Sequence, residues 1–152
     1  KDCMNHFGRR DSFSAFPAEY SSILQVVEEI GKSKGLKLIT RSVDPWGGSF
    51  RSDHFPFAAR GIPAISLGMA GGFENRSEDD VRRTMEQVGS TYHQPNDEIH
   101  SAWVYDGVIQ ELDLLYSLGR HWADGGVKPM MRVDKSNPFW ATQVWYGLRS
   151  ND

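Results

Sequence analysis

Apolar residues recur at helical spacing in two segments of the chain, and this pattern predicts two amphipathic helices. The first opens at Pro17-Ala18-Glu19 and ends near Gly31, and its apolar positions are Tyr20, Ile23, Leu24, Val27 and Ile30. The second follows Asp106, and its apolar positions are Val108, Ile109, Leu112, Leu115, Leu118, Gly119 and Trp122. Because each segment is apolar on one side only, we expect both helices to pack on a sheet.

Two short apolar runs have the length and flanking residues of strands. They are Leu36 to Thr40, which follows the first helix, and Ala64 to Leu67, which follows a turn at Gly61-Ile62-Pro63. Such runs, bounded by turn residues, are typical of buried strands. The alternation of strands with helices predicts an α/β protein.

Two further helix starts are marked by polar residues. Ser52 or Asp53 is expected to cap a helix that follows Arg51, and Ser77 is expected to cap a short helix through the 78–88 region. Acidic residues of the second start lie three residues before Arg82 and Arg83, so intrahelical ion pairs are expected there.

Size, charge and cysteine count exclude several classes of protein. The chain has 152 residues, 39% of them hydrophobic, which is enough to bury the core of one modest domain. Its net charge is −3 and its lysines and arginines are scattered, which argues against a nucleic-acid-binding surface. No apolar run approaches the roughly 20 residues of a membrane span. Cys3 is the single cysteine, so an intrachain disulfide is impossible.

Three polar motifs resemble the carboxyl half of two-zinc exopeptidases of the aminopeptidase and glutamate-carboxypeptidase type. They are Asp53-His54-Phe55-Pro56-Phe57 with the Gly61 turn, Tyr92-His93-Gln94-Pro95, and Asp2-Cys3-Met4-Asn5-His6-Phe7-Gly8. The resemblance implies a three-layer α/β/α fold with a mixed, mostly parallel central sheet. It places residues 1–123 in the catalytic domain and leaves 124–152 as a tail of unknown role.

The resemblance also implies roles for five residues. Asp2 and His93 match ligands of different zinc ions, and imidazole and carboxylate are groups that zinc prefers. Tyr92 matches a residue that polarises the scissile carbonyl in some members. Asp53 and Asp97 are expected to orient the metal-binding groups, although either could be a plain helix cap. Hydrolysis would proceed through a metal-activated water.

The resemblance implies further metal ligands that do not occur in these 152 residues. A histidine and aspartate pair and two adjacent glutamates, one of them the general base, are expected upstream of residue 1. The single adjacent pair here, Glu28-Glu29, falls on the polar face of the first helix and is expected to be solvated. We therefore expect a carboxyl portion that is inactive alone, and that needs an amino-terminal half or self-associates. Export to the periplasm or cell exterior is expected from the resemblance only.

Three functions remain open from the sequence. The first is a zinc-dependent exopeptidase, an aminopeptidase acting on peptide substrates. The second is a non-catalytic module that binds a partner through its aromatic tail, from Phe139 to Tyr146. The third is a glutaminyl cyclase-like enzyme with one zinc ion.

Overall fold

The computed structural model describes residues 5–40, 47, 50–99, 103–132, 136–145 and 147–148. Its centre is a three-stranded sheet in the order β2-β1-β3, made by β1 (Arg10–Phe16), β2 (Lys37–Leu38) and β3 (Ser66–Phe73). β1 pairs with β2 in parallel and with β3 in antiparallel orientation. The sheet is therefore mixed, and the prediction of an α/β protein is confirmed at that level.

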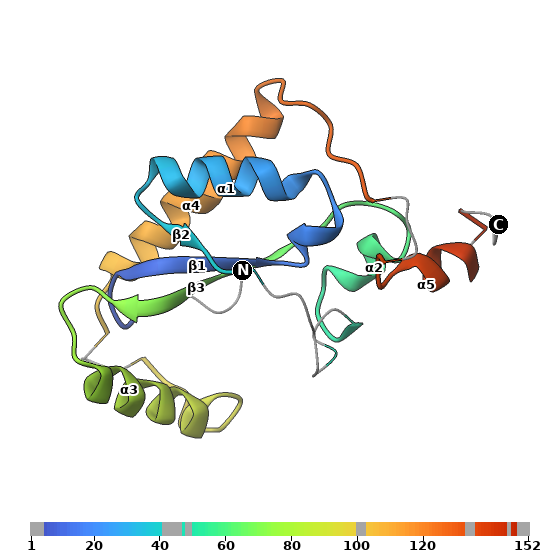
Figure 1. Cartoon of the computed structure of the whole chain (residues 1–152). Coiled ribbons are helices and arrows are strands. Elements are labelled where there is room, and N and C mark those ends of the chain that lie inside the picture. The colour runs from blue at the N-terminus through green and yellow to red at the C-terminus, as the bar shows by residue number, and fades with distance from the viewer. Residues whose placement is uncertain are drawn as a thin grey trace.

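Helices α1 (Ile23–Ser33) and α4 (Asp106–Ala123) lie together on one side of this sheet (Figure 1). The main core lies between these helices and the strands and contains Phe13, Ala15, Ala18, Ile23, Val27, Leu36, Leu67, Leu114 and Leu118. Gly31 is required at its place in α1, because a Cβ there would lie 2.3 Å from Cε1 of Phe13. The ammonium of Lys34 pairs with Asp113 at 2.6 Å and joins the two helices.

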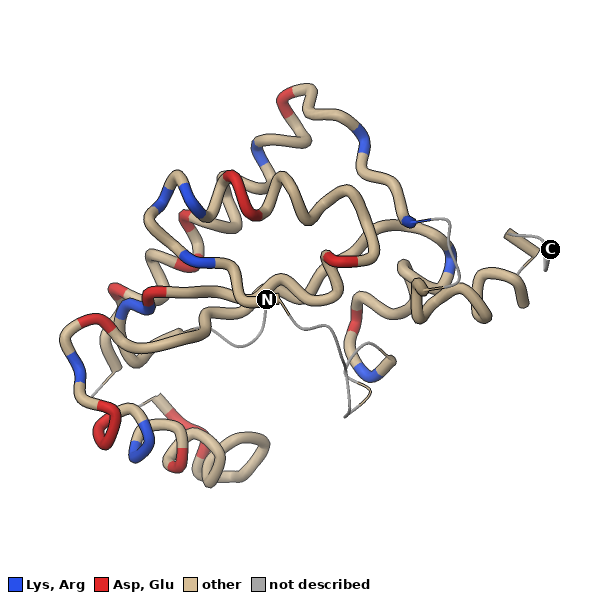
Figure 2. The backbone as a smooth tube through the Cα atoms, in the orientation of Figure 1, with Lys and Arg blue, Asp and Glu red and all other residues tan. Residues whose placement is uncertain are grey.

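Helix α3 (Glu78–Thr91) lies on the opposite side of the sheet from α1 and α4 (Figure 1). Its start agrees with the prediction, because the hydroxyl of Ser77 accepts a hydrogen bond from the N–H of Asp80 at 3.3 Å. Arg82 pairs with Asp79 at 2.8 Å, so the expected intrahelical pairing is confirmed. Acidic and basic residues are interspersed along this helix (Figure 2).

The carboxyl-terminal segment packs on the short helix α2 (Phe55–Ala58). Phe139 is fully buried with Ala58 and Met131, and Nε2 of Gln143 in α5 (Trp140–Trp145) donates to the carbonyl of Ala58 at 2.9 Å. Phe139 is thus a core residue and is not free to bind a partner. Trp145, by contrast, is 86% exposed.

Several element boundaries differ from the sequence-based expectations. β1 was not expected, and β3 runs from Ser66 to Phe73 where a strand was expected from Ala64 to Leu67. The first helix is interrupted, since a 3₁₀ turn, η1 (Ala18–Tyr20), precedes α1. The cap predicted for α2 is wrong: the helix begins after His54, and neither Ser52 nor Asp53 occupies that position.

Candidate metal centre

His93 directly follows the end of α3 and has an unusual backbone conformation. Tyr92 is the C-cap residue of α3, and the φ of the next residue, His93, is +61°. This left-handed region is costly for a residue with a Cβ, and such residues cluster at functional sites. The two aromatic rings stack at a centroid distance of 3.9 Å.

The ring of His93 lies between two cavities. One has a volume of about 480 Å³ and is also lined by His6, Asp97 and Trp103. The other has a volume of about 910 Å³, and its walls include Asp53 and His54 together with Ile65, Leu67, Leu115, Leu118 and Trp122. His93 is exposed, so both cavities give a ligand or metal ion access to it.

The fold brings four of the five predicted site residues to this region. Asp97 shares one of these cavities with Tyr92 and His93, and Asp53 shares the other. Within the described residues, neither carboxylate is hydrogen-bonded to His93. Tyr92 is 49% exposed at a helix end and lines both cavities. Asp2 lies outside the described residues.

Two further histidines lie near His93. His54 is buried at the start of α2, in agreement with a packing role. His6 was not assigned from the sequence, yet it lines the same cavity as His93 and its ring lies 4.0 Å from that of Trp103. His6 belongs to the Asp2 to Gly8 motif, but that motif assigns the ligand role to Asp2, and His6 shares a cavity with His93 only through folding.

The donor set of the described residues does not by itself complete a zinc site. A structural zinc site has four protein ligands and a catalytic one usually has three. Across the part of the chain that the structure describes, no group of three or more histidine, cysteine, aspartate or glutamate side chains could hold a metal ion. His93 is the single predicted ligand within that part.

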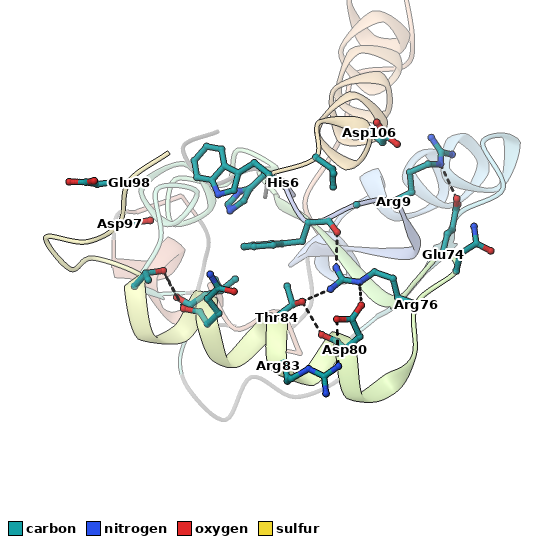
Figure 3. A pocket seen from close by; sticks show the side chains of 18 of the residues that line it. His6, Arg9, Glu74, Arg76, Asp80, Arg83, Thr84, Asp97, Glu98 and Asp106 are labelled. Atoms are coloured by element: carbon teal, nitrogen blue, oxygen red, sulfur yellow. Dashed lines mark hydrogen bonds and ion pairs between the residues drawn. The ribbon is translucent and has the colours of Figure 1, made fainter. Parts of the chain in front are cut away.

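A groove of about 690 Å³ adjoins the 480 Å³ cavity beside His93. It runs along α3 (Figure 3). Arg76 lies at its far end, held by Asp80 at 2.6 Å, by the carbonyl of Phe7 at 2.8 Å and by the hydroxyl of Thr84 at 2.5 Å. The hydrogen bond from Arg76 lowers the pKa of Asp80 below its ordinary value. Asp80 is therefore ionised at neutral pH, and the end of the groove is fixed by charged groups.

A second arginine lies behind this end of the groove. The guanidinium groups of Arg10 and Arg76 lie 4.0 Å and 4.6 Å from the centre of the Phe73 ring. Burial lowers the pKa of Arg10, Asp11 opposes that change, and the charge of Arg76 adds to it. Positive charge is thus concentrated around Phe73.

The sequence matches the model of Peptidase family M28 over residues 1–113. The chain belongs to this family. M28 members are zinc-dependent enzymes of aminopeptidase and carboxypeptidase type, so the resemblance drawn from the sequence is confirmed at family level. Comparison with curated proteins gave no match, nor did comparison with solved structures.

The matched range, residues 1–113, covers β1 to β3, α3 and the first part of α4, and it includes every predicted site residue. It assigns the chain to the metallopeptidases. None of the helices that the structure describes has the length and apolar character needed to cross a bilayer.

Proposed function

We propose that the chain is part of a zinc-dependent aminopeptidase that removes single residues from peptides. The observation that carries the proposal is the position of His93. It is an exposed imidazole in a left-handed conformation, it follows α3 directly, and it lies between two cavities. M28 membership supports the hydrolytic chemistry and the choice of zinc.

Five residues have proposed roles in this function. His93 and Asp2 are the proposed metal ligands. Tyr92 is proposed to polarise the substrate carbonyl, since its half-exposed ring lies beside His93. Asp53 and Asp97 are proposed to orient metal-binding groups from opposite sides, each from the cavity that it shares with His93.

The finer features of the fold remain part of the proposal. A three-layer arrangement is supported by helices on both sides of β1 and β3 (Figure 1). The mostly parallel character of the whole sheet is proposed from the family alone, since β1 pairs with β2 in parallel but with β3 in antiparallel orientation. Residues 1–123 are proposed as catalytic domain and 124–152 as a tail, which the packing of Phe139 would fasten to α2. Export is likewise proposed from the family alone.

We further propose that the 152-residue chain does not hydrolyse peptides by itself. Asp2 and His93 are two of about five ligands that a dinuclear site needs, and so few ligands cannot hold both metal ions tightly. A further polypeptide segment, or a second copy of the chain, would supply the other ligands.

The test is an assay of the zinc-loaded chain with an aminoacyl amide and with a peptide that begins with glutamine. No turnover, combined with zinc binding that depends on His93, is the expected result. Amide hydrolysis that is lost in His93→Ala would support the aminopeptidase function. It would also overturn the proposal that the 152-residue chain is inactive by itself. Pyroglutamate formation would instead favour the single-zinc cyclase. Absence of both turnover and His93-dependent zinc binding would contradict the proposed function.

A further inference from the structure

The cavity beside His93 and the groove along α3 adjoin each other, and the two together are called the channel below. Both are lined by His6, Phe7, Val88, Thr91, Asp97 and Trp103, so the two spaces meet at these side chains. His93 lines the cavity but not the groove, and Arg76 and Arg83 line the groove but not the cavity. Figure 3 shows both arginines in the groove. A molecule held at His93 can therefore extend along α3.

Helix α3 forms one wall of this channel along most of its length. The lining residues from the helix recur at helical spacing and are Asp80, Arg83, Thr84, Gln87, Val88 and Thr91. From Arg83 to Thr91 the helix rises about 12 Å, because each residue adds about 1.5 Å. An extended peptide covers this distance with roughly three to four residues, at about 3.4 Å each.

The charges of the channel differ between its ends. Asp97 and Glu98 lie towards the His93 end, and Arg76 and Arg83 lie towards the other (Figure 3). The carboxylate of Asp80 is 2.6 Å from Arg76 but 3.9 Å from Arg83. Because one carboxylate faces two guanidinium groups, this pair of arginines keeps one net positive charge.

The groove as a whole is lined by three arginines and five carboxylates, but among the described ion pairs Arg83 has Asp80 alone as its partner. Glu74 is 3.0 Å from Arg9, which neutralises it. Asp106 lies at the start of α4, across the groove from α3 (Figure 3). The side chain of Arg83 is 66% exposed, so its donors are accessible to a ligand.

We propose that the channel binds short peptides with a free carboxyl terminus, and that Arg83 holds the terminal carboxylate while the amino-terminal end lies at His93. The proposal rests on the proposed peptidase function, for which it names the substrate class. A carboxylate matches the guanidinium group in charge and geometry, and the acidic end at Asp97 and Glu98 favours the amino group of the same peptide. Peptides of about four or five residues fit the length of the α3 wall.

Calorimetric titration of the full chain tests this proposal without any reaction. The titrants are an alanine-rich peptide of about five residues with a free carboxyl terminus and the same peptide as its carboxyl-terminal amide, both in zinc-free buffer. We expect the acid to bind about five- to tenfold more tightly than the amide, as a partly exposed ion pair allows, and this preference to shrink at high salt. In Arg83→Gln the two peptides should bind equally, and Arg83→Lys should keep part of the preference.

Arg82 provides the matched control. It precedes Arg83 on α3, its side chain is equally exposed at 66%, and it pairs with Asp79 but does not line the groove. Arg82→Gln should therefore keep the full preference for the acid. Equal binding of acid and amide by the wild type, survival of the preference in Arg83→Gln, its loss in both variants, or no binding of either peptide would each overturn the proposal.

The two proposals fail in distinguishable ways. Zinc binding by Arg83→Gln should equal that of the wild type, because Arg83 lies at the end of the channel remote from His93. Loss of the acid preference with intact His93-dependent zinc binding removes the channel proposal alone. Loss of zinc binding with an intact acid preference removes the metal site and leaves a peptide-binding channel.

Discussion

Gln110 on α4 is hydrogen-bonded to both backbone groups of Arg10 at the start of β1. The Arg10 N–H donates to Oε1 of Gln110 at 2.9 Å, and Nε2 of Gln110 donates to the Arg10 carbonyl at 2.9 Å. The side-chain amide thus takes the place of a neighbouring strand. This contact fixes α4 against β1 close to Phe7 and Arg9, both of which line the groove.

Replacement of Gln110 by alanine should destabilise the fold. The variant leaves a buried N–H and a buried carbonyl of Arg10 without partners, which costs about 2 kcal/mol of unfolding free energy. Chemical denaturation measures the loss. Gln25→Ala is the control, because Gln25 lies on the exposed face of α1 and its side chain is hydrogen-bonded to the exposed Glu29. Equal stability of the two variants would show that the Gln110 contact contributes nothing.

The left-handed backbone of His93 predicts an unusual order of stability among its variants. His93→Gly should be roughly 0.5 to 1 kcal/mol more stable than His93→Ala, because glycine adopts a φ of +61° without strain. At Ser90, an exposed position inside α3, the order should reverse, since alanine is the better helix former. Thermal or chemical unfolding of the four variants tests this. If His93→Ala were as stable as His93→Gly or more so, as expected for Ser90→Ala against Ser90→Gly, His93 would carry no strain.

The ion pair between Asp80 and Arg76 predicts a pH dependence of stability. The hydrogen bond from Arg76 lowers the folded-state pKa of Asp80 below its ordinary value of 3.8. A depressed carboxylate pKa stabilises the fold above the unfolded-state value, and the effect is lost as the pH falls through the folded-state value. Asp80→Asn should therefore unfold at a lower temperature than the wild type at pH 7, and the difference should vanish in acid.

Asp79→Asn is the control for this pH series. Asp79 pairs with Arg82 on the exposed side of α3 and does not line the groove. Its replacement should lower the unfolding temperature less than Asp80→Asn does. A difference between Asp80→Asn and the wild type that stays constant from neutral pH into acid would contradict the role of the Arg76 pair.

Local patterns were sufficient for three of the described helices. The apolar spacing predicted α1 and α4, and the Ser77 cap predicted the start of α3. β1 was missed because its sequence, Arg10–Phe16, buries polar residues beside Phe13 and Ala15, which hides the alternation. The length of β3 was missed because Gly71 and Gly72 are typical of loops, whereas here they pack close to Asp11.

The candidate site was predictable only where a motif carries it. His93, Tyr92, Asp53 and Asp97 belong to contiguous motifs, and the fold places all four around two cavities. The channel along α3 could not be predicted, since it joins residues near position 6 to residues near position 83. Contacts of that separation depend on how α3 packs against β3.

Zinc titration of the metal-stripped chain by calorimetry tests the central claim most directly. It should be run beside His93→Ala, Asp2→Ala and His121→Ala, the last at an exposed histidine of α4 away from the cavities of His93. We predict binding at roughly micromolar affinity or tighter that is lost in the first two variants and unchanged in the third. Unchanged binding in His93→Ala, or no binding by a folded wild-type sample, would contradict a metal site built on His93.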